Sequence, residues 1–169
     1  MAVQGIKNIK IKIATMKRNL LIILSSLLLV ACQKGVVYTE FCSISAEGWH
    51  KDSVLYFEPC IANSNTNYQL QITLRHNDNY PYQNLWLFVD ICKDSTVSIH
   101  DTIECYLANE RGTWLGQGLS IYELPLLYEN NFQFADSGQY SISIQQGMRC
   151  DTLAGIKEVG LKIINNGKE

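Results

Sequence analysis

The feature that most constrains this chain is a strict alternation of apolar and polar residues. In the segment YQLQITLR, residues 68–75, Tyr68, Leu70, Ile72 and Leu74 alternate with polar side chains. A period of two predicts a β-strand with one buried face. The pattern recurs in QYSISIQQ (139–146) and VGLKI (159–163), and further strands are expected at residues 36–43, 53–57, 84–92 and 102–107.

No segment after residue 32 keeps a helical periodicity over three turns. The best helical candidate is DTLAGI, residues 151–156, where Asp151 would cap a single turn. Turn-forming stretches such as NSNTN, HNDNYP and ADSG separate the predicted strands. About seven or eight short antiparallel strands in one domain predict an all-β fold, an antiparallel β-sandwich that is jelly-roll-like.

The N-terminal part of the chain is typical of an export signal that ends in a cysteine. An uncharged apolar run, residues 20–31, follows Lys17 and Arg18 and leads into the sequence LVAC, which ends at Cys32. A membrane-spanning helix needs about 20 apolar residues, so this run is too short to span. A basic start, a short apolar core and a terminal cysteine match a bacterial lipobox, in which Cys32 is acylated. An ordinary signal peptide that contains a cysteine is the alternative.

These observations divide the chain. Residues 16–31 are expected to be the lipoprotein signal peptide, because Met16 and the two basic residues after it form a complete start. Residues 1–15 are interpreted as an upstream mis-start. Residues 32–36 would form a short tether and residues 37–169 a single β-sandwich domain. Lipid on Cys32 would hold that domain at a membrane surface.

Composition argues against several classes of function. The net charge is −2 and no basic patch stands out, so nucleic-acid binding is not expected. There is no CxxC pair and the histidines are isolated, so no metal site is expected. No cofactor motif is present, and neither a cofactor nor a small-molecule substrate is expected.

The cysteines leave two alternatives open. Because an exported chain meets oxidising conditions, one or two disulfides would fit, and so would buried, unpaired thiols. Five cysteines remain once Cys32 is lipidated: Cys42, Cys60, Cys92, Cys105 and Cys150. Because five is an odd number, at least one stays unpaired or pairs between chains.

One predicted strand, residues 84–92, is apolar on both faces. Alternate residues from Leu85 to Ile91 would fill the core side, so Trp86 and Phe88 must point the other way. These two rings are either covered by a loop or by the opposite edge, or they form a partner-binding surface. Trp114, among the glycines of RGTWLGQG, would occupy either a tight corner or a partner contact. The candidate partner-binding residues are Trp86, Phe88, Tyr80, Tyr82 and Trp114.

Three motifs together give a family resemblance. YPYQNLW (80–86), WLGQG (114–118) and QQGMR (145–149), in this order and spacing, resemble the GldH family of gliding-motility lipoproteins of the Bacteroidetes. The resemblance runs from the lipobox to about residue 164. It implies a lipoprotein associated with the outer membrane and with the machinery for gliding and protein secretion. Cys32 is the only functional residue that it carries over.

Two functions remain open at this point. The first is a structural or assembly component, anchored in the outer membrane by lipid on Cys32, with protein partners in the cell envelope such as other gliding-motility lipoproteins. The second is a glycan-binding envelope lipoprotein, whose exposed Trp and Tyr rings would stack on sugars. No motif such as GxSxG, HExxH or a P-loop is present, and the chain is not expected to be an enzyme. The start CQKGVV lacks acidic residues often associated with surface export, which slightly favours the periplasmic face over the cell surface.

Overall fold

The computed structural model describes residues 35–94 and 96–167. The expected upstream segment 1–15, the signal peptide 16–31 and Cys32 all lie outside the described residues. Within the described ranges, no helix is long and apolar enough to cross a membrane. The strand β1 begins at Val36, so residue 36 belongs to the sheet and not to the tether.

The described residues form β-strands joined by turns. The strands are β1 Val36–Ser43, β2 Trp49–His50, β3 Leu55–Phe57, β4 Cys60–Ile61, β5 Tyr68–His76, β6 Asn84–Lys93, β7 Thr96–Tyr106, β8 Tyr122–Phe132, β9 Gly138–Gln139, β10 Ser141–Gln146, β11 Thr152–Leu153 and β12 Ile156–Asn165.

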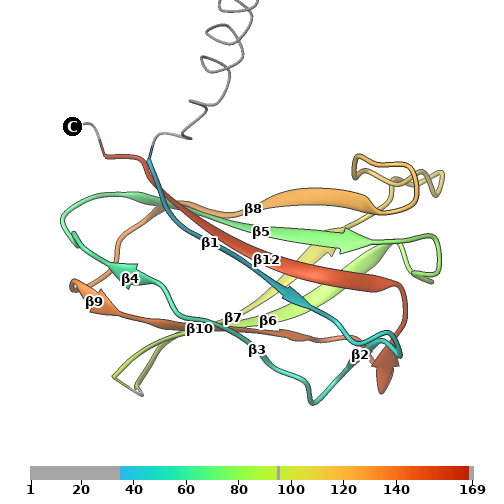
Figure 1. The fold of residues 1–169 in the computed structure, drawn as a ribbon, viewed down its shortest axis with the longest axis horizontal. Helices are drawn as coiled ribbons and strands as arrows, with labels where there is room; N and C mark the ends of the chain where they lie inside the picture. The colour runs from blue at the N-terminus through green and yellow to red at the C-terminus, as the bar shows by residue number, and fades with distance from the viewer. Residues whose placement is uncertain (1–34, 95, 168–169) are drawn as a thin grey trace, which may run out of the picture. The chain divides into compact units, whose positions relative to one another are not determined.

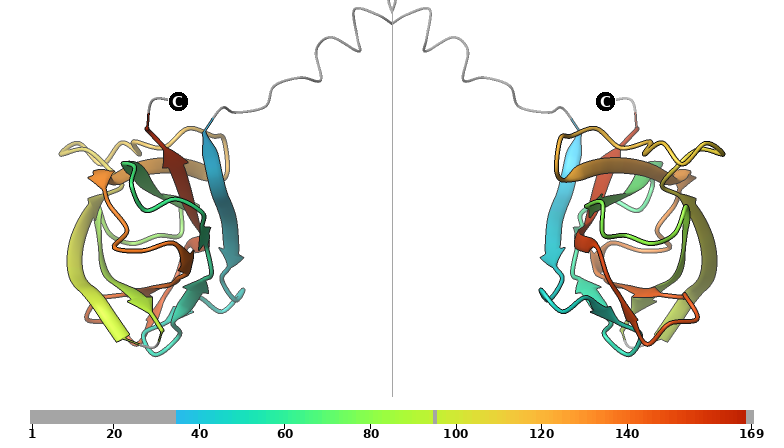
Figure 2. Two further views of the ribbon diagram at one scale, coloured as in Figure 1. Left: turned by 90° about the vertical axis from the view of Figure 1, so that its left-hand side faces the viewer. Right: turned by 90° about the vertical axis from the view of Figure 1, so that its right-hand side faces the viewer.

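Two four-stranded sheets face each other (Figures 1 and 2). The first has the strand order β1-β12-β5-β8 and the second the order β3-β10-β6-β7, and all their pairs are antiparallel. Two further pairs of short strands, β11 with β2 and β4 with β9, form between segments that connect the long strands. The predicted all-β sandwich is therefore confirmed.

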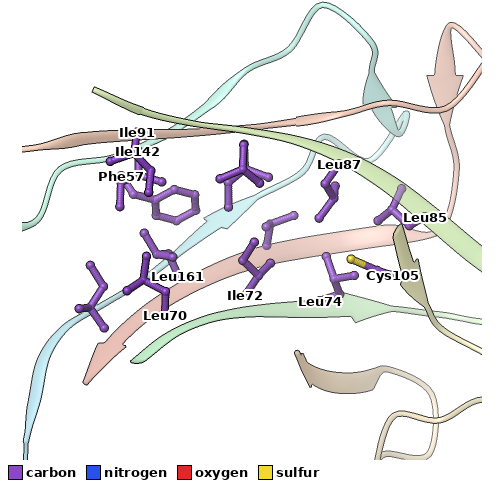
Figure 3. Close-up of a cluster of buried hydrophobic side chains, with 14 of the residues drawn as sticks. Phe57, Leu70, Ile72, Leu74, Leu85, Leu87, Ile91, Cys105, Ile142 and Leu161 are labelled. Atoms are coloured by element: carbon purple, nitrogen blue, oxygen red, sulfur yellow. The ribbon is translucent and has the colours of Figure 1, made fainter. Parts of the chain in front are cut away.

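The core lies between the sheets and is made by alternate residues of the long strands. Leu70, Ile72 and Leu74 of β5 are 0% exposed. Figure 3 shows these residues with Leu161 on one side of the layer, and Leu85, Leu87, Ile91 and Ile142 on the other. Burial of one such side chain contributes roughly 1.5–3 kcal/mol, so the alternation itself supplies much of the driving force for folding.

Two strands differ from the sequence-based expectation. The strand β8 was not predicted, because Pro125 interrupts its alternation; it is the last strand of its sheet, where a residue without an N–H is tolerated. The strand β7 begins at Thr96, well before residue 102, and its first residues are mostly exposed.

The predicted helical turn at residues 151–156 is wrong. Thr152 and Leu153 form β11 and pair with His50 and Trp49 of β2. Gly155 follows with φ +87°, a left-handed conformation that suits glycine. A Cβ at Gly155 would lie 2.3 Å from the backbone nitrogen of Tyr80, so this turn packs directly on the connection between β5 and β6.

The cysteines within residues 35–94 and 96–167 are all free thiols in this structure. Cys60 is exposed and Cys105 is buried, while Cys42, Cys92 and Cys150 are intermediate. Burial raises the pKa of the Cys105 thiol to about 12. Of the two alternatives left open by the sequence, the structure shows the unpaired one.

Candidate functional site

The strand β6 presents two aromatic rings on the outside of the second sheet. Its inward residues Leu85 and Leu87 are 0% exposed, whereas Trp86 is 39% exposed and Phe88 38% exposed. Tyr82, just before the strand, is 41% exposed. We call Tyr82, Trp86 and Phe88 the aromatic face. The three rings form an exposed aromatic surface at the start and on the outer side of β6.

The segment after β10 holds the aromatic face in place. The Gly147 N–H donates to the Trp86 carbonyl at 2.7 Å, and the Trp86 N–H donates to the Met148 sulfur at 3.4 Å. A Cβ on Gly147 would lie 3.2 Å from two Phe88 ring carbons and 3.3 Å from the Trp86 Cβ. The missing side chain at Gly147 therefore allows this segment to pack closely beside both rings, which explains the QQGM part of the sequence motif in physical terms.

A shallow groove of about 480 Å³ runs along this contact. It is lined by Tyr82, Asn84, Trp86, Gly147, Met148 and Arg149. The side chain of Arg149 is exposed, and no carboxylate among the described residues forms an ion pair with it. The groove therefore combines an aromatic wall, a flexible thioether and one available cation.

Polar residues surround the two rings. Strand pairing places Glu104 of β7 opposite Trp86, and Thr102 and Gln145 on either side of Phe88. Paired residues of neighbouring strands share a face, so all of these side chains belong to the outer surface. The Asn84 side chain donates to Glu104 at 2.5 Å, and the Tyr106 hydroxyl donates to the same carboxylate at 2.9 Å. Glu104 is thus held in place beside Trp86.

Two exposed tyrosines on this sheet were missed by sequence reasoning. Tyr56 of β3 is 61% exposed and Tyr106 of β7 is 58% exposed. Tyr56 pairs with Ser143, which pairs with Asp90 on β6, and Tyr106 pairs with Asn84. Their alternation within each strand was a usable signal, but only the strand order shows that they share the surface of Trp86 and Phe88.

Two candidate residues do not belong to the exposed surface. Tyr80 is 3% exposed, and its hydroxyl donates to the Asn84 carbonyl at 2.7 Å. Burial raises the pKa of this phenol well above its usual range. The expectation that Tyr80 adds aromatic surface is therefore wrong: its ring lies behind Tyr82, with the two ring centroids 5.9 Å apart.

Trp114 packs against the core at a corner. Its indole N–H donates to Asp78 at 2.9 Å, and its ring centroid lies 4.6 Å from that of His76 and 6.1 Å from that of Tyr122. Tyr80 closes the same group of rings. Of the two roles that the sequence left open for Trp114, this geometry is that of the corner.

His76 lies at the centre of this corner and was not singled out by the sequence. It is 0% exposed, and its Nε2 atom has no hydrogen-bond partner among the described residues. Burial lowers the pKa of His76, outweighing the Asn77 carbonyl and the Asp78 carboxylate, which act in the opposite direction. The imidazole is therefore held neutral among aromatic rings.

Two carboxylates, Asp90 and Glu104, share the outer surface with the rings. Glu104 pairs with Trp86, which lies four residues from Asp90 on β6, so the two carboxylates are about 13 Å apart along the sheet. Glycosidase carboxylates stand about 5–9.5 Å apart. Asp90 is instead bonded to His100. Within the described residues, no group of three His, Cys, Asp or Glu side chains could hold a metal ion.

Comparison with known proteins gives a consistent family. Residues 36–163 match the family of the GldH lipoprotein. The Gliding motility lipoprotein GldH of Flavobacterium johnsoniae is 36% identical over 155 residues, covering 87% of this chain and 96% of that protein. The Gliding motility lipoprotein GldH homolog of Christiangramia forsetii is 38% identical over 149 residues, covering 83% of this chain and 91% of that protein. The described domain spans nearly the whole of the matched region, and the chain belongs to the GldH lipoprotein family.

Proposed function

We propose that this protein is a lipid-anchored component of a gliding-motility or associated secretion machinery, with a structural or assembly role. In this proposal Cys32 carries the lipid and holds the β-sandwich at the outer membrane, with the periplasmic face favoured. The names of the relatives support the lipoprotein and its link to gliding motility. The domain needs no catalytic step to act in this way.

The observation that carries the docking role is the aromatic face. Trp86 and Phe88 remain about two-fifths exposed, although each is large enough to contribute substantially to a core. Aromatic anchors of this kind commonly account for a large share of interface energy, with about 2 kcal/mol or more lost on truncation. The groove beside them adds Met148, an adaptable apolar side chain, and Arg149, which can pair with a carboxylate of the partner.

The anchor is tested by Cys32→Ala in the full chain. We expect the variant to leave the membrane fraction or to stay as an uncleaved precursor. Without lipid on residue 32, the mature domain has no anchor there, and the apolar run of the signal is too short to span the membrane by itself. Mass spectrometry of the mature N-terminus is the direct measurement. An unmodified cysteine, or cleavage at another position, would show that the lipoprotein assignment of Cys32 is wrong.

The docking role is tested by Trp86→Ala and Phe88→Ala. A photo-crosslinking residue that replaces Tyr82, the third residue of the aromatic face, reports the partner bound there in the full chain and in native membranes. Each substitution should lower the yield of the adduct about 30-fold, which corresponds to about 2 kcal/mol. Leu127→Ala is the matched control, because Leu127 is 56% exposed on the first sheet.

Thermal melts of the same variants separate docking from a purely structural role. About three-fifths of each ring is buried, so truncation should cost roughly 1–2 kcal/mol. Leu87→Ala, at a fully buried position of β6, should cost about 2–5 kcal/mol. If the ring variants were as unstable as Leu87→Ala and their folded fraction gave an unchanged adduct, the docking role would be lost.

Glycan binding is the second candidate, and one observation favours it. Polar side chains able to bond sugar hydroxyls stand beside the rings, namely Asn84, Glu104 and Gln145. Calorimetric titration of the purified domain with envelope polysaccharides distinguishes the two functions. A saturable signal that Trp86→Ala removes would favour a glycan ligand, whereas the absence of heat together with a protein adduct would favour assembly.

A further inference from the structure

The strands β7 and β8 end the two sheets on the same side of the sandwich. Each is the last strand of its sheet. A slot of about 510 Å³ lies between them, lined by residues 103–106 of β7 and 126–128 of β8. Ile72 of β5 also lines the slot although it is 0% exposed at the surface of the domain. The slot therefore leads from solvent to the apolar layer between the sheets.

The opposite side of the sandwich, where β1 faces β3, is closed by hydrogen bonds. The Glu58 N–H donates to the Tyr38 hydroxyl at 3.0 Å, and the Cys42 thiol donates to the Tyr56 carbonyl at 3.8 Å. In the part of the chain that the structure describes, β7 and β8 are joined only by one long side-chain hydrogen bond of 3.4 Å. The side at β7 and β8 is thus the more open of the two.

The backbone of β7 offers hydrogen-bonding groups along this open side. The Leu107 N–H donates to the Gln83 carbonyl at 2.7 Å, so odd-numbered residues of this part of β7 bond toward β6. The Gly147 N–H donates to the Trp86 carbonyl at 2.7 Å, so Trp86 bonds toward β10. Its partner on the other side, Glu104, therefore directs its own N–H and carbonyl away from β6.

The same alternation covers the even-numbered residues from His100 to Tyr106. Of their four N–H groups, that of Thr102 donates to the Asp101 carboxylate at 2.7 Å. The N–H groups of His100, Glu104 and Tyr106 have no partner within residues 35–94 and 96–167. The edge therefore has donors and carbonyls placed at the spacing that an added strand requires.

The strand β7 lacks two common protections of an edge strand. Neither proline nor lysine occurs in Thr96–Tyr106. The strand β8 on the other wall of the slot carries Pro125, which has no N–H to offer a new strand. An unprotected edge can bind an extended segment by main-chain hydrogen bonds, with side-chain pockets that select its sequence. Of the two edges, β7 is the one suited to such pairing.

Both edge strands are acidic. They contain no lysine or arginine, and their carboxylates are Asp101, Glu104, Glu123 and Glu129. Glu123 is paired with Arg75, whereas Asp101 and Glu104 receive only neutral donors from the described residues. His100, the basic side chain of β7, is bonded to Asp90. A second copy of β7 would place like charges side by side, so the charge favours a different strand that carries lysine or arginine.

We propose that β7 accepts an extended segment of a different protein as a fifth strand of the second sheet. The segment bonds to the backbone of Glu104 and Tyr106. Its apolar side chains enter the slot against Ile103 and Leu126, and its lysine or arginine side chains lie beside Glu104 on the outer face. Because each face of a strand repeats every second residue, the recognised sequence alternates apolar and basic residues.

This inference rests on the proposed docking function and names the kind of partner. Glu104 lines the slot and also pairs with Trp86 of the aromatic face. A segment added to β7 therefore lies next to that face, and one partner can contact both.

The test uses the full chain in detergent and a soluble peptide of alternating valine and lysine that matches residues 100–106 in length. Hydrogen exchange is measured at single amides. At a peptide concentration about ten times its Kd, exchange at Glu104 and Tyr106 should slow about tenfold. The amides of Ile103 and Cys105, which face β6, are the internal reference and should exchange slowly with and without peptide.

A variant of the protein tests the charge. Glu104→Gln keeps an acceptor for Asn84 and Tyr106 and should weaken peptide binding about two- to fivefold, the range for one opposite-charge pair across strands. Glu129→Gln is the matched control, because it removes a carboxylate of β8 that does not line the slot, and it should leave the affinity unchanged.

Two altered peptides and one property of the protein alone would overturn the proposal. Equal binding of an isomer with its valines and lysines in separate blocks would show attraction by charge alone. Equal binding of a fully N-methylated peptide, or unchanged exchange at Glu104 and Tyr106, would exclude backbone pairing at this edge. Protection of these amides that grows with protein concentration, without peptide, would show that a second copy occupies the edge.

The cross-link from residue 82 in native membranes separates this failure from failure of the proposed function. An adduct that Trp86→Ala removes, together with no peptide binding, would keep the docking role and exclude the β7 edge. Peptide binding with protection of Glu104 and Tyr106, but without any adduct at residue 82, would support the edge site and remove the docking role of the aromatic face.

Discussion

The buried imidazole of His76 should make the stability of this domain depend on pH. In the unfolded chain His76 has a pKa of about 6.5. Burial lowers the pKa in the folded state, so the unfolded state binds more protons as the pH falls below that value. Stability is therefore retained above about pH 6.5 and is progressively lost below it, toward the folded-state pKa.

The magnitude follows from proton linkage for one group. The loss is at most about 1.4 kcal/mol for each pH unit, and between about pH 7.5 and 5.5 it sums to about 1.4 kcal/mol at most. For a domain of this size that corresponds to roughly 4–8 °C in melting temperature. Nothing near His76 can offset it fully, because the imidazole is 0% exposed and its Nε2 atom lacks a partner among the described residues.

The perturbation that isolates this effect is His76→Phe. Phenylalanine keeps a ring against Trp114 and Tyr122, removes the unpartnered nitrogen and cannot be protonated. Any packing change is the same at every pH, so it moves the whole stability curve without changing its slope. Losing an unsatisfied buried polar atom should also add about 1–3 kcal/mol at neutral pH, less any cost of the larger ring.

The assay is chemical denaturation of both proteins at several pH values. His50 and His100 are present in both, so the difference between the two curves reports His76 alone. We expect that difference to grow as the pH falls from about 7.5 to 5.5. Parallel curves would refute the reasoning, because they would mean that the folded domain accepts a proton at His76 as easily as the unfolded chain does.

Two further predictions follow from the packing. Gly155→Ala should destabilise the domain by about 4 kcal/mol or more in thermal unfolding, because φ at Gly155 is +87° and the added Cβ would lie 2.3 Å from the Tyr80 backbone. Gly112→Ala is the control: φ there is a similar +77° but the space around it is open, so the substitution should cost only about 1–2 kcal/mol. Equal losses of stability in the two variants would contradict the packing argument. In the reduced native domain a maleimide should label the exposed Cys60 rapidly and the buried Cys105 only after unfolding, since burial raises the pKa of Cys105 to about 12; rapid native labelling of Cys105 would show that this part of the core opens.

The prediction from sequence was strongest where alternation is uninterrupted. The strands at residues 68–75 and 84–92 appear as β5 and β6 with the expected inward residues, since burial of one face is a property of the strand itself. Prediction from sequence failed where the conformation of a segment depends on the strands that lie beside it in space. Pro125 is acceptable because β8 is an edge strand, and DTLAGI is extended because β2 pairs with it, and neither pairing is encoded locally.

The residues of the candidate site also fall into those that the sequence could place and those that it could not. Sequence alone placed Trp86 and Phe88 on the side of β6 opposite the core, because successive side chains of a strand point to opposite faces. It could not separate Tyr82 from Tyr80, since Tyr80 packs against the rings of His76 and Trp114, which come from other parts of the chain. Nor could it show that Trp114 closes a corner around a buried His76, or that Leu119 is left in solvent. Local periodicity determines which way a side chain points from its own strand, whereas the packing of distant segments decides whether anything covers it.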